Sequence, residues 1–150
     1  MLRKESHMTV KQISIFLENR PGSLAELIDV LSKEEINMRA MSVGETEDFG
    51  ILRIIVQDPY KAICVLKQNG YVCSITPVLA VAVPDEAGSL LNILNILGKN
   101  GVNLDYTYAF TMKKKDFAYM VFRVQDNEKA IDVLSKNKIE LISQDDLAQM

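Results

Sequence analysis

The chain is predicted to be an α+β protein of two ferredoxin-like βαββαβ modules packed together, each with an antiparallel sheet and helices on one face. Three observations predict this fold class. The segment that starts at Pro21 recurs 66 residues later at Ala87. Strand-like and helix-like patterns follow one another in the order β-α-β-β-α-β in both halves. No flexible linker separates the halves, so we expect the two modules to hold a fixed relation.

The repeat is carried by residues at the start of a helix, along it and just after it. Identical pairs at this spacing are Gly22 and Gly88, Ser23 and Ser89, Leu24 and Leu90, Leu31 and Leu97, Lys33 and Lys99, and Asn37 and Asn103. Two copies of a sequence unit indicate two copies of one fold. The predicted domains are therefore residues 8–76 and 77–150. Residues 1–7, which include His7, are expected to be a tag or disordered leader, with the natural start at Met8.

Alternating apolar residues and runs of branched side chains predict the strands of the first repeat. They are expected at Val10–Leu17, Asn37–Val43, Phe49–Val56 and Tyr71–Ile75. A helix separates the first two strands, because apolar residues recur at helical spacing from Leu24 to Leu31. The second helix begins at Asp58–Pro59, with the aspartate as N-cap and the proline in the first turn. It ends at Asn69–Gly70, where glycine favours a helix terminus.

The second repeat shows the same order of elements. Its strands are expected at Val78–Val83, Leu104–Thr111, Phe117–Val124 and Ile139–Ser143. Its first helix carries apolar residues from Leu90 to Leu97, and Asp126 caps its second helix. Beyond the central hairpin the offset between repeats becomes 68, so this hairpin is longer than the first. Residues 145–150 are predicted to form a short helical tail, with Asp145 and Asp146 as its cap.

The boundary between the modules is expected at Ile75–Thr76–Pro77, where the proline should end one strand before the next begins. The strand that follows, Val78–Val83, is apolar at every position. Strands of that kind are buried on both faces of their sheet. We therefore expect the sheet face that a lone module would expose to be covered by another module or subunit.

Composition and motifs exclude several classes of protein. A net charge of −3 and an isoelectric point near 5.2 argue against nucleic-acid binding. No apolar stretch is long enough to cross a bilayer and no signal peptide is present, so the chain is predicted to be cytoplasmic, without a membrane partner. Two cysteines cannot form a disulfide framework. No phosphate loop, nucleophile motif or metal-ligand cluster occurs, so we expect no catalytic residues, no metal and no cofactor, and we predict no enzyme.

The strand-to-helix turn of each repeat is the candidate binding site. A helix start presents unpaired N–H groups at the positive end of the helix dipole, which suits a carboxylate or a phosphate. Gly22 and Gly88 would let a ligand approach the backbone without a side chain in the way. Asp85, or the side-chain oxygen of Asn19, is suited to hold an α-amino group. Together these residues predict a site for an amino acid.

Two asparagines, Asn37 and Asn103, open the strand after each helix and are expected to lie close to that turn. An amide donates and accepts, so each could bond both ends of an amino acid. Purely local explanations stay open at this point. The glycines could serve close helix packing, Ser23 with Glu26 matches a capping box, and the asparagines could be ordinary turn residues.

Both turns share one pattern: an apolar strand, Asn or Asp, any residue, Pro or Ala, then Gly-Ser-Leu, an apolar helix, and Ile or Val before Asn. This pattern resembles the ACT domain, a small ligand-binding regulatory module of amino-acid metabolism. The resemblance covers about residues 10–143. The second repeat is also similar to the regulatory part of aspartokinases, and the whole chain resembles the stand-alone tandem ACT proteins of bacteria.

The resemblance implies that amino acids bind at interfaces between paired ACT units, through the first turn and the start of the second strand. In the first repeat the implied residues are Asn19, Arg20, Pro21, Gly22, Ser23, Leu24, Asn37 and Met38. In the second repeat they are Asp85, Glu86, Ala87, Gly88, Ser89, Leu90, Asn103 and Leu104. Two departures matter: Ala87 stands where the family usually has proline, and Asn19 corresponds to Asp85, so the two sites need not bind equally.

The favoured hypothesis is a non-catalytic regulatory protein that binds a small amino acid or similar ligand. It would form a homodimer and signal to a separate enzyme of amino-acid metabolism. The alternative is a scaffold or oligomerisation subunit without a ligand. RNA binding is a third hypothesis, because the RRM shares this order of elements, but the central strands here are mostly aliphatic and lack the aromatic platform of that domain.

Overall fold

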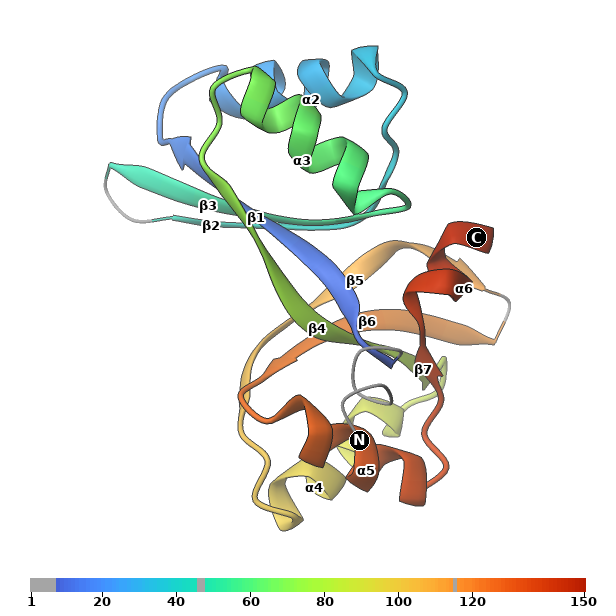
Figure 1. Cartoon of the computed structure of the whole chain (residues 1–150). Coiled ribbons are helices and arrows are strands. Elements are labelled where there is room, and N and C mark those ends of the chain that lie inside the picture. Colours follow the sequence, from blue (N-terminus) through green and yellow to red (C-terminus); the bar gives the residue numbers. More distant parts are fainter. Residues whose placement is uncertain (1–7, 46–47, 115) are drawn as a thin grey trace. The chain divides into compact units, whose positions relative to one another are not determined.

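The computed structural model describes residues 8–45, 48–114 and 116–150 (Figure 1), and the expected tag or leader at 1–7 lies outside them. The chain divides into two compact units. The first unit consists of Lys11–Thr76. The second unit consists of Pro77–Met150 together with the described residues before Lys11.

The first unit has the predicted order of elements. It runs β1 (Val10–Glu18), α2 (Ser23–Lys33), β2 (Met38–Glu45), β3 (Phe49–Val56), α3 (Pro59–Gln68) and the start of β4 (Cys73–Pro84). β3 pairs antiparallel with β1 on one side and with β2 on the other. β4 begins beside β1, where the N–H of Phe16 donates to the C=O of Val72 at 3.0 Å. Figure 1 shows α2 and α3 on one face of this sheet.

The core of the first unit lies between that sheet face and the two helices. β1 contributes Ile13, Ile15 and Leu17, one at every second position, and all three are buried. α2 contributes Leu27 and Leu31, which are buried at helical spacing. The strand and helix periodicities therefore point to the same core, as the sequence predicts.

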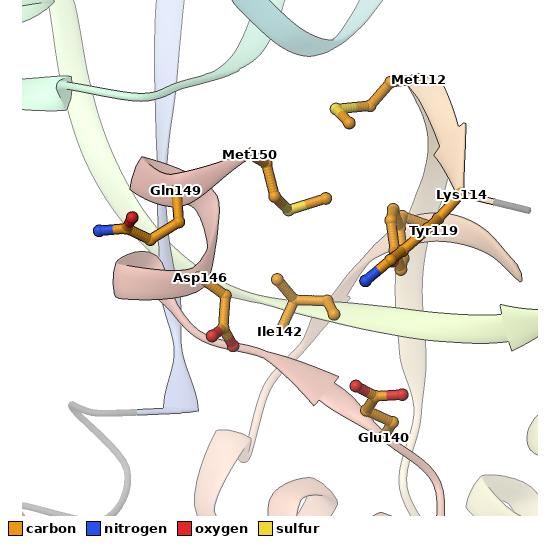
Figure 2. A pocket seen from close by; sticks show the side chains of 8 residues that line it. All are labelled: Met112, Lys114, Tyr119, Glu140, Ile142, Asp146, Gln149 and Met150. Carbon is orange, nitrogen blue, oxygen red and sulfur yellow. The ribbon is translucent and has the colours of Figure 1, made fainter.

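The second unit repeats this order and adds a helix. After β4 come α4 (Ser89–Lys99), β5 (Leu104–Lys114), β6 (Phe117–Val124), α5 (Asn127–Lys136), β7 (Leu141–Ile142) and α6 (Gln144–Gln149). Antiparallel pairing orders the strands β5–β6–β4–β7. α4 and α5 cover one face of this sheet, whereas α6 lies on the other side (Figure 1), with Ile142 beside it and Tyr119 across from it (Figure 2). The prediction that the helices lie on one face of the sheet therefore holds for the first unit. In the second unit it holds for α4 and α5 but not for α6.

α6 is the helical tail that the sequence predicts, and Asp146 takes part in its cap as predicted, but the N-cap residue itself is Ser143. Ser143 is the N-cap, and its hydroxyl accepts from the N–H of Asp146 at 3.1 Å. The Asp146 carboxylate accepts in return from the N–H of Ser143 at 2.9 Å. This reciprocal pair is a capping box, which fixes the first turn of the helix. Leu147 anchors the helix, since its side chain is fully buried.

β4 is buried on both faces, as its apolar composition predicts. Every residue of Val78–Val83 is at most 5% exposed. The strand runs through Pro77 without a break, so the prediction that this proline ends a strand is wrong. The pairings of β4 with β6 and β7 begin at Leu79 and Ala80. Pro77 lies ahead of these two ladders, so its missing N–H interrupts neither of them.

Four helices are followed by a residue with positive φ. Gly70 and Gly101 follow α3 and α4, with φ of 83° and 72°. Glu35 and Lys138 hold the corresponding places after α2 and α5, with φ of 56° and 59°. Glycine adopts left-handed backbone freely, whereas a residue with a side chain is strained there. The chain therefore stores strain at two helix ends and avoids it at the other two.

Exchanging residues at these helix ends should change stability in opposite directions. Lys138→Gly should raise the free energy of unfolding by about 0.5–1 kcal/mol, because it removes the strain. Gly70→Ala should lower it by about 1 kcal/mol, since the added Cβ would meet nothing within 4 Å and only the backbone strain remains. Urea unfolding followed by circular dichroism measures both changes. Two variants as stable as the unmodified chain would contradict this account of the helix ends.

Candidate ligand-binding turns

Backbone hydrogen bonds hold the turn between β1 and α2 on both sides. The N–H of Asn19 donates to the C=O of Asp48 at 3.1 Å, which ties the end of β1 to the start of β3. The N–H of Glu26 donates to the C=O of Gly22 at 3.0 Å and makes the first bond at the start of α2. The turn is therefore fixed to the sheet at one end and to the helix at the other.

The turn between β4 and α4 has the same hydrogen bonds. The N–H of Asp85 donates to the C=O of Asp116 at 2.9 Å, and the N–H of Asn92 donates to the C=O of Gly88 at 3.0 Å. The serine that begins each helix also bonds three residues back, Ser23 to Arg20 at 3.3 Å and Ser89 to Glu86 at 3.2 Å. Ala87 stands where the first turn has Pro21, so this turn forms without proline.

Both helices begin on a glycine in left-handed backbone and have no side-chain cap. Gly22 has φ of 83° and Gly88 has φ of 88°, and the N-cap position of neither helix supplies a side-chain cap hydrogen bond. Asp58 and Asp126, by contrast, cap α3 and α5, where their carboxylates accept backbone N–H bonds of 3.1 and 3.0 Å. Uncapped starts are therefore a property of the two repeated turns and not of every helix in this chain.

The space beside each glycine is open. A Cβ added to Gly22 or Gly88 would meet nothing within 4 Å, so close helix packing is not the reason for glycine here. The next N–H groups belong to the first helical turn, where a helix has no internal acceptor. They are the amides of Leu24 and Ala25 in α2 and of Leu90 and Leu91 in α4. Open space at the positive end of a helix dipole is what an anion requires.

The predicted turn residues are mostly accessible. Those that are exposed are Asn19, Arg20, Pro21, Gly22, Asp85, Glu86, Ala87 and Gly88. Leu24, Ser89 and Leu90 are half-buried, and Ser23 is buried. A ligand in solution can therefore reach the backbone of both turns without a rearrangement.

Ser23 does not form the capping box that its spacing from Glu26 suggests. Its hydroxyl donates backward to the C=O of Glu18 at 2.7 Å, and the residue is 8% exposed. This bond holds the end of β1 against the start of α2. The hydroxyl therefore does not cap the amides at the start of α2, and the capping-box interpretation is wrong for this turn.

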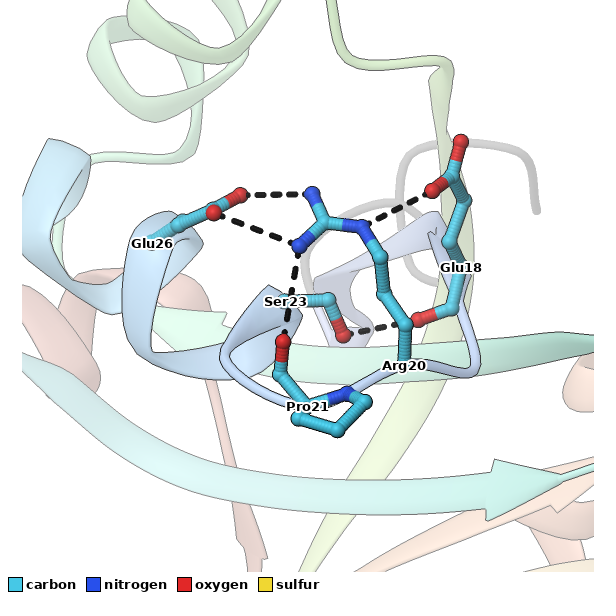
Figure 3. A network of polar contacts seen from close by, with 5 residues as sticks. All are labelled: Glu18, Arg20, Pro21, Ser23 and Glu26. Carbon is cyan, nitrogen blue, oxygen red and sulfur yellow. Dashed lines mark hydrogen bonds and ion pairs between the residues drawn. The ribbon is translucent and has the colours of Figure 1, made fainter.

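Arg20 lies between two carboxylates at the start of α2 (Figure 3). Its Nη2 and Nη1 lie 2.8 and 3.3 Å from the carboxylate oxygens of Glu26, and its Nε lies 2.9 Å from Glu18. Nη1 also donates to the C=O of Pro21 at 3.5 Å. The charged side chains are 47% to 72% exposed, so water and salt screen their attraction. The network holds Arg20 in place more than it stabilises the fold.

The contact with Arg20 lowers the pKa of Glu26 below its ordinary value, through their hydrogen bond and the attraction of their charges. The same contact raises the pKa of Arg20. A carboxyl group whose pKa is lower in the folded chain than in the unfolded chain stabilises the fold at neutral pH. That stabilisation disappears as the pH falls through the lowered pKa.

Glu26→Gln should therefore lower stability near neutral pH and have no effect in strong acid, where Glu26 is protonated in both states. Urea unfolding at a series of pH values measures the difference between variant and unmodified chain. Glu128→Gln is a matched control, because Glu128 lies in the first turn of α5 and has no ion-pair partner among the described residues. A difference for Glu26→Gln that does not shrink towards acid would contradict the assignment.

A depression of about 400 Å³ lies beside the first turn. Its lining combines residues 17–20 and 22–25, at the turn, with Val43 and Glu45 of β2 and Gly50 of β3. Those last three residues, like Leu17, Glu18 and Ala25, are not among the predicted site residues. Strand register explains their presence, because Gly50 pairs with both Leu17 and Glu45. A correct sheet order worked out from the sequence would have indicated them.

The asparagine expected beside the first turn lies at the other end of the sheet. Asn37 precedes Met38, which pairs with Val56, whereas the turn follows Glu18, which pairs with Phe49. The start of β2 and the end of β1 are therefore separated by the length of β3, roughly 23 Å at 3.3 Å per residue. The expectation of proximity within one module is therefore wrong. The reason is α2, which is about 16 Å long and returns the chain to the level where β1 begins.

The second unit has the same arrangement. Leu104 pairs with Val124 at one end of β6, whereas Pro84, just before the turn, pairs with Phe117 at the other end. Asn103, the residue before Leu104, therefore lies far from the turn of its own module. Its side chain is exposed and donates to a carboxylate oxygen of Asp105, two residues on, at 3.1 Å.

The two turns differ in side-chain charge although their backbones match. Arg20 and Glu26 of the first turn correspond to Glu86 and Asn92 in the second. The second turn therefore carries two carboxylates, those of Asp85 and Glu86, with no arginine in the place of Arg20. An anion can meet the backbone of either turn, but a ligand's ammonium group would meet more negative charge at the second turn.

In the part of the chain that the structure describes, no cluster of three or more His, Cys, Asp and Glu side chains could hold a metal ion. Of the helices in that part, none is long and apolar enough to cross a membrane. Cys64 and Cys73 are free thiols, and Cys73 packs against the core of the first unit while Cys64 is exposed.

Comparisons with known proteins agree with the repeated fold. A family model described as an ACT domain pair matches residues 8–150. The crystal structure of protein BT0572 from Bacteroides thetaiotaomicron is 40% identical to this chain with a TM-score of 0.90, and the match covers 97% of this chain and 99% of that one. The regulatory subunits of aspartate kinase from Thermus thermophilus, in ligand-free form, and from Thermus flavus are similar in fold. They are 12% and 13% identical with TM-scores of 0.63 and 0.59, and each match covers 86% of this chain and 92% of that one. No curated protein matched the chain.

Proposed function

The chain belongs to the family of ACT domain pairs, and from that premise we propose that it is a regulatory protein without catalytic activity of its own. In this proposal it binds a small amino acid at its strand-to-helix turns. It then passes its bound state to a separate enzyme of amino-acid metabolism in the cytoplasm. The observation that carries the proposal is the pair of helix starts, uncapped and open, behind left-handed glycines.

The carboxylate of the ligand is the group that these turns suit. The amides of Leu90 and Leu91 lie at the positive end of the α4 dipole, and Gly88 leaves the approach to them clear. Hydrogen bonds from N–H groups to a carboxylate are charge-assisted and therefore stronger than bonds between neutral groups. The first turn offers the same kind of amides, so either repeat can hold the carboxylate.

The ammonium group of the ligand distinguishes the two turns. Asp85 places an exposed carboxylate in the second turn, whereas Asn19 offers only an amide oxygen at the same place in the first. Glu86 adds a further negative charge beside Asp85. We therefore assign the stronger binding to the second repeat and the weaker binding to the first.

Asn37 and Asn103, with Met38 and Leu104 after them, enter the proposal only through a module other than their own, and we propose that a second copy of the chain supplies it. Each asparagine lies at the far end of the sheet from the turn of its own module. In a homodimer the partner's copy could bring an asparagine to a turn, where its amide would both donate and accept. We therefore propose a homodimer in which two chains share the ligand.

Regulation would follow from the difference in affinity between two arrangements of the dimer. A ligand held by two chains favours the arrangement in which both contact it. The ligand can shift the equilibrium only by the free energy of that difference. A partner enzyme that docks on one arrangement would thereby sense the amino acid.

A thermal-shift screen of the twenty common amino acids tests the proposal, because a ligand that binds only the folded state raises the midpoint of unfolding. Asp85→Ala and Asn103→Ala should each weaken binding of the hit by about 1–3 kcal/mol, the loss of a hydrogen bond to a charged group. Asn95→Ala is the control, since Asn95 is exposed on α4 away from the turn and should leave affinity unchanged.

The screen also separates the proposal from its alternative. If none of the amino acids shifts the midpoint at about millimolar concentration, the protein is better explained as a scaffold or oligomerisation subunit without a ligand. A hit that binds both variants with undiminished affinity would place its site away from these turns.

A further inference from the structure

The second unit contains a hollow that the ACT turns do not include. It has a volume of about 480 Å³ and lies on the sheet face opposite α4 and α5. Figure 2 shows the side chains that line it, which come from β5, β6, β7, the residue before β7, and the segment of α6. Small-molecule sites in proteins have volumes of roughly 300–1,000 Å³, so the hollow is large enough for a metabolite.

The hollow lies where β4 carries two small side chains on this face, Ala80 and Ala82. Ala82 of β4 pairs with Tyr119 of β6, and the same register sets it opposite Glu140, whose C=O accepts from the N–H of Ala82 at 3.0 Å. Ala80 pairs with Ile142 of β7 in the same way. Residues directly opposite one another share a face of the sheet. Methyl groups between larger side chains leave a depression in the middle strand.

α6 closes one side of the hollow and is held firmly. Its first turn is fixed by the Ser143–Asp146 capping box, and Leu147 is fully buried. The Asp146 carboxylate lines the hollow but already accepts the N–H of Ser143 at 2.9 Å. One carboxylate oxygen of Asp146 therefore serves the helix.

One part of the hollow carries two opposite charges that are not paired with each other. Figure 2 shows the ammonium group of Lys114 and the carboxylate of Glu140 on the same side of the hollow. Neither has an ion-pair or hydrogen-bond partner within the described residues. An ammonium and a carboxylate set apart in this way match a zwitterion, which brings the opposite group to each.

The remaining part of the hollow is mostly apolar, with Gln149 as a polar member of the lining. It is lined by Met112, Tyr119, Ile142 and Met150, and Figure 2 shows both methionine side chains on the side away from Glu140. Methionine is flexible and polarizable, so it adapts to ligands of different shape. An apolar side chain placed here would be removed from water, while its charged groups stay near the opening.

We propose that this hollow is a second ligand site, separate from the ACT turns, for an α-amino acid with an apolar side chain. The ammonium group of the ligand meets Glu140, its carboxylate meets Lys114, and its side chain lies among Met112, Ile142 and Met150. The proposal does not rest on binding at the turns, because none of these residues belongs to them. The second unit would then sense an apolar amino acid through its sheet face.

Titration of the full chain with L-leucine, followed by the methyl NMR signals of its methionines, tests the proposal. The Met112 and Met150 signals should shift and saturate. N-acetyl-L-leucine lacks the ammonium group, L-leucinamide lacks the carboxylate and glycine lacks the apolar side chain. Each should bind about tenfold more weakly, as expected for the loss of one recognition element.

Variants of Lys114 and Glu140 test whether these two charged side chains bind the ligand. Lys114→Gln and Glu140→Gln should each weaken L-leucine binding by about tenfold. Both residues are exposed, so neither change should impair folding. Lys99→Gln on α4 and Glu128→Gln on α5 are matched controls on the helix side, and both should leave binding unchanged.

Three results would overturn the proposal. The first is no shift of either methionine signal at about 10 mM L-leucine, a range that includes even weak metabolite binding. The second is equal binding of leucine and its blocked derivatives. The third is binding that Asp85→Ala abolishes while Lys114→Gln and Glu140→Gln retain it. That third result would place leucine at the turns and would support the proposed function while ending this inference.

Discussion

The site proposed here depends on one backbone constraint: α2 and α4 each start from a glycine with positive φ and have no side-chain cap. Left-handed backbone turns the chain sharply from strand to helix and leaves no side chain beside the first helical amides. Ser23 uses its hydroxyl on Glu18, the Arg20 guanidinium binds Glu18, Glu26 and the C=O of Pro21, and backbone bonds fix both ends of the turn. The helix starts are therefore held rigidly while their amides stay open. Preorganised donors of this kind bind an anion without first having to be arranged.

Much of the fold could be predicted from the sequence because its signals are local. The helical spacing of Leu27 and Leu31 and the alternation of Ile13 and Ile15 fix which faces are buried. Strand register is a long-range property, and the predictions that depended on it were wrong. Asn37 opens a strand that is parallel to β1, so it lies at the end of the sheet remote from the turn.

Side-chain environments were the second source of error. The spacing of Ser23 and Glu26 matches a capping box. In the structure, however, the Glu26 carboxylate binds Arg20 and the Ser23 hydroxyl donates to the C=O of Glu18 at the end of β1. Pro77 was expected to end a strand, but β4 runs through it, and Pro77 precedes the pairings of β4 with β6 and β7. The hollow over Ala82 has no local sequence signal, because it appears only when three strands are set in register.

The most direct test of the central claim is an amide NMR titration with the amino acid that gives the largest thermal shift. A carboxylate docked on a helix start polarises the N–H groups that it meets. The amide protons of Leu90 and Leu91, or of Leu24 and Ala25, should therefore move downfield and follow the same isotherm as the binding measured by calorimetry. Saturation of the protein while all four resonances keep their positions would contradict the claim.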